Sequence, residues 1–158
     1  MKKLLSIILT TILLISLFSI TTYAQSPEII ISETTEYFED GSSITTTVTQ
    51  LASNDLTRAT KTITGSKTKT VKNGDGDVLY KFKVTGTFTV NEGVSATCTA
   101  VSCSASNLAS GWSLDSSTKS KSSNKATATG VFKYTVLFIS TTQETTATLT
   151  CDKNGNLS

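Results

Sequence analysis

The sequence predicts an all-β protein of about eight strands, either an antiparallel β-sandwich of immunoglobulin-like architecture or a partly open barrel. Two observations support this prediction. Apolar and polar residues alternate over long stretches rich in Thr, Val and aromatic residues, which is the pattern of half-buried strands. Clusters of Gly, Asn and Asp separate these stretches, as turns between antiparallel strands require.

The alternation is clearest in the middle of the chain and in its last third. One run extends from Val78 to Val90, a second from Ala126 to Phe138, and a third contains Ala147, Leu149 and Cys151. Residues two apart in a strand share a face of the sheet. We therefore expect one core lined by the in-phase residues of the two strongest runs: Tyr80, Phe82, Val84, Phe88, Val90, Phe132, Tyr134, Val136 and Phe138.

Turn residues set the expected strand order. "EDGS" at 39–42, "NGDGD" at 73–77 and "NEG" at 91–93 each predict a hairpin. The lysine-rich segment at 66–72, polar on both faces, suits an edge strand. The Ser- and Lys-rich segment at 117–125 is expected to be a loop.

The N-terminal segment has the pattern of a secretory signal peptide. Lys2 and Lys3 precede an apolar stretch at 4–20, and "TTYA" then ends in the small residue Ala24. Although the stretch is about long enough to span a bilayer, the small-residue site favours cleavage after Ala24 over a retained anchor. We expect residues 25–158 to form a single secreted, extracellular domain with no membrane partner after cleavage.

Composition excludes two classes of function. Cleavage removes two lysines and leaves 12 basic and 12 acidic residues, without a basic cluster, so nucleic acid is not an expected partner. The chain has no histidine, which rules out Ser-His-Asp and Cys-His catalysis within it. The S-x-x-K match at 116–119 lacks a helix to align its side chains, and carboxylate pairs such as Asp75 and Asp77 lie in turns. We expect no catalytic residue and no enzyme activity.

Metal and cofactor binding are also not expected. Asn73, Asp75 and Asp77 have the one-three-five spacing of a calcium loop, but Val78 and Val84 stand where the loop needs Gly and Glu. The segment from Asp152 begins similarly and is interpreted as a turn. Thr45, Thr47 and Thr49 are expected on a solvated sheet face, which offers a flat polar surface without an evident site.

The three cysteines allow one bridge. Five residues of extended strand span about 16 Å, whereas bridged Cα atoms lie within about 7 Å, so Cys98 and Cys103 cannot pair. The apolar phase shifts near Ala100, as a β-bulge produces, and both cysteines can then face inward. Either can reach Cys151. The mid-strand position of Cys98 favours Cys98–Cys151, with Cys103 as a free, buried thiol, over Cys103–Cys151.

Several stretches resemble a group of small secreted all-β proteins of Gram-positive bacteria that have no assigned function. They are "YFEDGSSITTT", "TRATKT", "KFKVTGTFTVNEGVSATCT", "SNKATATG" and "TATLTCDKNGNLS". The resemblance implies export, an all-β fold and a bridge between the cysteines of "ATCT" and "LTCD", which are Cys98 and Cys151. Cys103 departs from that pattern. The resemblance implies no activity.

The sequence thus favours a secreted, non-enzymatic β-sandwich that acts as a binding or surface-associated structural protein, with an extracellular protein or glycan as its partner. A bacteriocin-like antagonistic effector is the alternative, and a small hydrolase is the third. Cys98, Trp112 and Cys151 have the order of an immunoglobulin core, but Leu149 stands where that family has a tyrosine.

Overall fold

The computed structural model describes residues 27–52 and 60–158. It contains eight strands: β1 (Glu28–Tyr37), β2 (Ser43–Leu51), β3 (Thr60–Lys72), β4 (Val78–Asn91), β5 (Ser95–Ser106), β6 (Trp112–Ser122), β7 (Lys125–Val136) and β8 (Ile139–Thr150). The expected signal peptide at 1–24 lies outside the described residues. Within them, no helix is long and apolar enough to cross a membrane.

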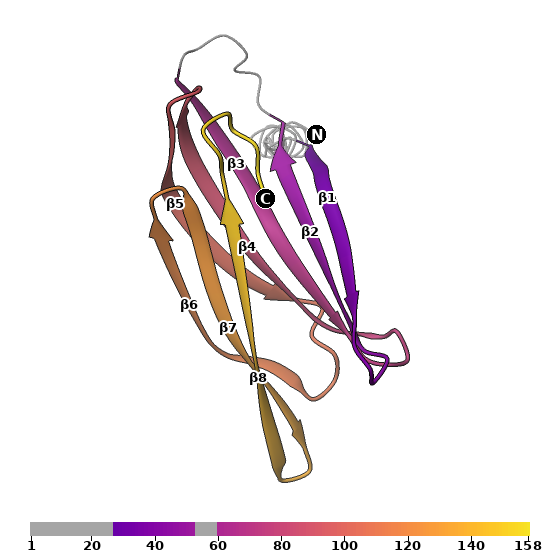
Figure 1. Cartoon of the computed structure of the whole chain (residues 1–158). Coiled ribbons are helices and arrows are strands. Elements are labelled where there is room, and N and C mark those ends of the chain that lie inside the picture. Colours follow the sequence, from indigo (N-terminus) through magenta and orange to yellow (C-terminus); the bar gives the residue numbers. More distant parts are fainter. Residues whose placement is uncertain (1–26, 53–59) are drawn as a thin grey trace, which may run out of the picture.

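The strands form two antiparallel sheets that are not closed into a barrel, which confirms the predicted sandwich (Figure 1). The larger sheet has the order β1-β2-β3-β4-β5 and the smaller one the order β6-β7-β8. Each is a simple meander, so the strand order differs from that of an immunoglobulin domain. The smaller sheet lies against β3, β4 and β5. Every residue of β1 is exposed.

The predicted hairpins at 39–42, 73–77 and 91–93 are confirmed. The bulge is also confirmed: Thr87 pairs with Ala100 and Phe88 with Cys98, so Thr99 is the extra residue. Two expectations are wrong. The segment at 66–72 is no edge strand, because it belongs to β3, which pairs with both β2 and β4. The segment at 117–125 is no loop, because β6 continues to Ser122 and pairs with β7.

An aromatic cluster joins the two sheets. Phe132 on β7 stacks on Tyr80 of β4 with ring centroids 3.7 Å apart, and its ring meets Phe82 edge-on at 5.7 Å. The Tyr80 hydroxyl lies 2.8 Å from Thr145 Oγ1 on β8, a hydrogen bond across the core. Burial raises the pKa of Tyr80. Because the Tyr80 hydroxyl has a hydrogen-bond partner, the cluster buries no unpaired polar group.

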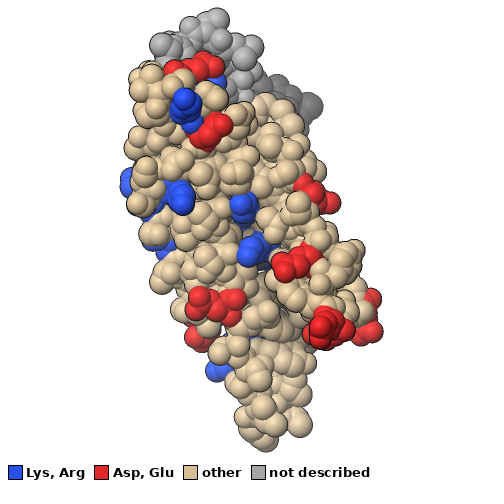
Figure 2. Space-filling view, viewed as in Figure 1, with Lys and Arg blue, Asp and Glu red and all other residues tan. Residues whose placement is uncertain are grey.

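Six of the nine predicted core residues are buried: Tyr80, Phe82, Val84, Phe88, Val90 and Phe132. The prediction is wrong for Tyr134, Val136 and Phe138, which are exposed, Phe138 completely at 102%. These residues lie where the β7–β8 hairpin projects past the body of the sandwich (Figure 1). The end of this projection shows no charged side chain in Figure 2. No strand of the larger sheet lies opposite it, so alternation there does not lead to burial.

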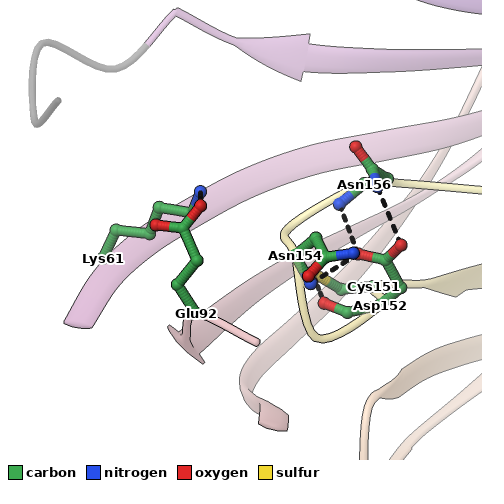
Figure 3. Close-up of polar contacts among 6 residues, drawn as sticks. All are labelled: Lys61, Glu92, Cys151, Asp152, Asn154 and Asn156. Atoms are coloured by element: carbon green, nitrogen blue, oxygen red, sulfur yellow. Dashed lines mark hydrogen bonds and ion pairs between the residues drawn. The ribbon is translucent and has the colours of Figure 1, made fainter. Parts of the chain in front are cut away.

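The C-terminal turn closes one end of the sandwich. Asp152 Oδ1 accepts hydrogen bonds of 2.8 Å from the backbone N–H groups of Asn154 and Asn156, and Oδ2 accepts one from Asn156 Nδ2 (Figure 3). These bonds lower the pKa of Asp152. The turn directs Leu157 into the core, where it is buried over Gly65. A side chain at Gly65 would collide with Leu157 Cδ1 and with the backbone carbonyl oxygen of Thr49, so this packing requires glycine.

Candidate functional site

The outer face of the five-stranded sheet carries a hollow of about 460 Å³. Lys81 shows which face this is, because it alternates with the buried Tyr80 and Phe82 and therefore points away from the core. The hollow spans strands β1 to β4, and most of its lining is polar: Glu33, Thr35, Tyr37, Ser43, Thr45, Thr47, Thr70, Lys72, Val78 and Lys81.

Strand register arranges these residues in rows. Thr35 pairs with Thr45, Thr45 with Thr70, and Thr70 with Lys81, so one row crosses four strands. Strands lie about 4.8 Å apart, so such a row is about 14 Å long. The neighbouring row runs from Tyr37 through Ser43 and Lys72 to Val78. The meander therefore turns alternating threonines into a regular array of hydroxyl groups.

Hydrogen bonds hold part of this array in place. Thr35 Oγ1 lies 3.0 Å from Thr45 Oγ1, and Thr47 Oγ1 donates to Glu33 Oε2 over 3.1 Å. Next to the hollow, Lys83 Nζ and Glu28 Oε1 form an ion pair of 2.9 Å. Lys72 and Lys81 form no ion pair within residues 27–52 and 60–158. Their ammonium groups remain available to acceptor groups of a ligand.

Tyr37 adds an aromatic surface to the polar array. It is 77% exposed and lies at the end of β1, in phase with the hydroxyl rows. A ring held on a strand presents a rigid apolar face at a low entropic cost. Tyr37 and Glu33 were not among the site residues predicted from the sequence. The available signal was the "EDGS" hairpin, which brings the "TEYF" strand into register with the threonines of β2.

The structure brings Cys98 of β5 and Cys151, which follows β8, to the turn between β6 and β7. Cys98 N–H donates to Ser123 O over 2.7 Å, and Cys151 N–H donates to Asn124 O over 3.0 Å. Both cysteines are buried. Cys103 lies elsewhere, half-buried beside β6, with its Sγ 3.8 Å from Ser117 Oγ. This placement favours Cys98 over Cys103 as the partner of Cys151.

All three cysteines are thiols in the structure, and the Cys98–Cys151 bridge stays a prediction. Burial, with smaller contributions from Asp152 and Cys98, raises the pKa of Cys151 to about 11. Burial also raises the pKa of Cys98. Since the thiolate is the reactive form, both folded thiols are poor nucleophiles at neutral pH. They are suited to a structural role and not to a catalytic one.

The residues considered for catalysis and calcium binding lie apart or are already used. Ser116 and Lys119 are three positions apart on β6, so their side chains point to opposite faces. The side chain of Asn73 accepts the N–H groups of Asp75 and Asp77 at 3.1 and 2.8 Å, which makes this segment a capped turn. Among the described residues, no three His, Cys, Asp or Glu side chains gather as metal ligands.

Comparison of the chain with protein-family models, with curated proteins and with solved structures finds no match. We therefore infer a function from the geometry of the described residues.

Proposed function

We propose that the protein is a secreted, non-enzymatic β-sandwich that binds an extracellular glycan on the outer face of its five-stranded sheet. Membership of the secreted Gram-positive group that it resembles is part of this proposal. The observation that carries it is the four-strand row of hydroxyl and ammonium groups that ends beside the exposed ring of Tyr37.

The chemistry of the hollow favours a sugar over other ligands. Pockets for apolar small molecules are lined mainly by hydrophobic side chains, whereas Tyr37 and Val78 are the apolar members of this lining. Specific protein interfaces bury about 800 Å² per partner around an apolar centre, which this face lacks. A sugar ring instead offers hydroxyl groups to Thr, Glu and Lys side chains, and its C–H face stacks on an aromatic ring.

The test is a binding assay with the secreted chain on cell-envelope polysaccharide and on mucin. We expect Tyr37→Ala to weaken binding at least about tenfold, equivalent to about 1.4 kcal/mol, because the stacking surface is lost. Tyr37→Phe keeps the ring and should bind nearly as well as the unmodified chain. Equal binding by Tyr37→Ala would contradict the assignment of this face.

A matched pair of threonine variants separates the site from a general surface effect. Thr45→Val removes a hydroxyl from the hollow, and we expect weaker binding. Thr146→Val removes the equivalent hydroxyl on the other sheet, where Thr146 Oγ1 lies 2.8 Å from Thr129 Oγ1, and should leave binding unchanged. Equal losses in both variants would place recognition outside the hollow.

The antagonistic effector is the second candidate, and the exposed apolar hairpin of β7 and β8 is the observation that favours it. A spot assay of the purified secreted chain on related bacteria distinguishes the two functions. We expect no zone of growth inhibition, because a binding protein has no lethal step. A clear zone would make the effector function the better account.

A further inference from the structure

The tip of the β7–β8 hairpin is an exposed and strongly apolar feature of the described chain. Val136, Leu137, Phe138 and Ile139 follow one another, and Leu137, Phe138 and Ile139 are 88%, 102% and 74% exposed. Val136 pairs with Ile139, so Leu137 and Phe138 form a two-residue turn at the apex. Large apolar side chains gathered at one projecting point are unusual on a soluble domain and mark an interaction site.

The backbone of this turn is also strained at Leu137. Leu137 has a φ of 54°, in the left-handed region that bulky residues avoid. Two-residue hairpins of type II′ place glycine at the first central position for this reason. A turn selected only to connect two strands has no use for a leucine here. Backbone strain and full exposure therefore coincide at the same residue, which is typical of a functional position.

We infer that this tip, defined as Val136 to Ile139, inserts into the interfacial region of a phospholipid bilayer. The inference is independent of glycan binding on the other sheet. It also departs from the expectation that the mature chain has no membrane partner. The tip is convex in Figures 1 and 2, so it suits a soft apolar medium that closes around it.

Charge supports a lipid partner. No charged residue occurs from Tyr134 to Gln143, so insertion desolvates no ion. The nearest charged residues along the chain are Lys133 and Glu144, one of each sign. Attraction to anionic lipids is therefore not the driving force, and burial of apolar surface is.

The base of the hairpin is suited to the headgroup region. Thr135 Oγ1 and Ser140 Oγ lie 3.1 Å apart, so each hydroxyl already has a partner. Tyr134 packs on Trp112 with ring centroids 5.2 Å apart, which holds the hairpin to the body. Tyr and Trp rings are favoured at membrane interfaces because one part is apolar and another polar.

Size argues against a second copy of the chain as the occupant. The tip has four residues, whereas a specific protein interface takes about 20–30 residues and about 800 Å² from each partner. A small apolar projection is, however, sufficient for reversible attachment to a bilayer, which does not need shape complementarity.

The test is flotation of the secreted chain with vesicles of phosphatidylcholine, alone or mixed three to one with phosphatidylglycerol. We expect binding to both, with less than about a threefold loss between low and high salt, because the tip is uncharged. The variant Leu137→Gly/Phe138→Asn should lose at least about tenfold in partitioning. It places glycine at the strained position, so the hairpin should fold at least as well.

A control variant and a depth measurement complete the design. Val94→Ser removes an exposed apolar side chain from the β4–β5 turn and should bind vesicles like the unmodified chain. When vesicles are added, the emission of the Phe138→Trp variant should shift to the blue, and lipids brominated in the acyl chains should quench it. The unmodified chain, whose only tryptophan is Trp112, is the reference. Undiminished flotation of the double variant, or unchanged Phe138→Trp emission, would overturn the inference. So would a dimer in sedimentation experiments that the double variant abolishes.

Discussion

Replacement of Phe132 with alanine is expected to lower the free energy of unfolding by about 3–5 kcal/mol. The Phe132 side chain is fully buried and contacts Tyr80 and Phe82, so its removal leaves a cavity between the two sheets. This loss is a large part of the stability of a small domain. Urea denaturation followed by circular dichroism measures the change.

Phe138→Ala is the matched control. Phe138 lies in phase with Phe132 along the same run of alternating residues, but it is completely exposed. We expect its replacement to change the free energy of unfolding by less than about 0.5 kcal/mol. Equal destabilisation of the two variants would mean that the hairpin tip packs against the protein. The description of the tip as exposed would then be wrong.

Oxidation of the chain comprising residues 25–158 is expected to join Cys98 to Cys151 and to raise the free energy of unfolding by about 4 kcal/mol. The bridge links the two sheets at the turn of Ser123 and Asn124, to which both cysteines are hydrogen-bonded. The two thiols give up two protons and two electrons, which a small-molecule disulfide accepts as it is reduced to two thiols. Unfolding with and without reductant measures the stabilisation.

Peptide mapping after thiol alkylation identifies the bridge. We expect alkylation at Cys103 alone, and the bridge should form unchanged in Cys103→Ala. An alkylated Cys98 in the oxidised chain, or a linkage through Cys103, would contradict the pairing.

The fold was largely predictable because alternation and turn residues are local signals. The hairpin at 39–42, the long strand from Val78 and the bulge beside Cys98 all follow from neighbouring residues. Alternation does not, however, show where the opposite sheet ends. Phe132 and Phe138 have the same phase, yet Phe132 lies under the larger sheet and Phe138 beyond it.

The prediction that residues 66–72 form an edge strand failed for a related reason. Lys67 and Lys69 pair with Val84 and Phe82, so they belong to the inner face. The smaller sheet leaves part of this face uncovered, and a lysine there can lay its stem on apolar surface and extend its charge outward. Burial accordingly lowers the pKa of Lys67.

The candidate site was less predictable because it exists only across strands. Thr35, Thr45 and Thr70 are far apart in the sequence and form a row only once the register is set. Each threonine by itself is ordinary strand surface. Tyr37 becomes a candidate binding residue only through the same register, which places it in one row with Ser43 and Lys72.

The most direct test of glycan binding is to map the contact surface on an isotopically labelled chain comprising residues 25–158. Oligosaccharides released from the bound polysaccharide are titrated while backbone amide chemical shifts are recorded. We predict that the shifts move at Thr35, Tyr37, Thr45 and Thr70, with Thr129 and Thr146 unchanged. Shifts confined to the three-stranded sheet or to the hairpin tip, or the absence of any shift, would contradict the proposal.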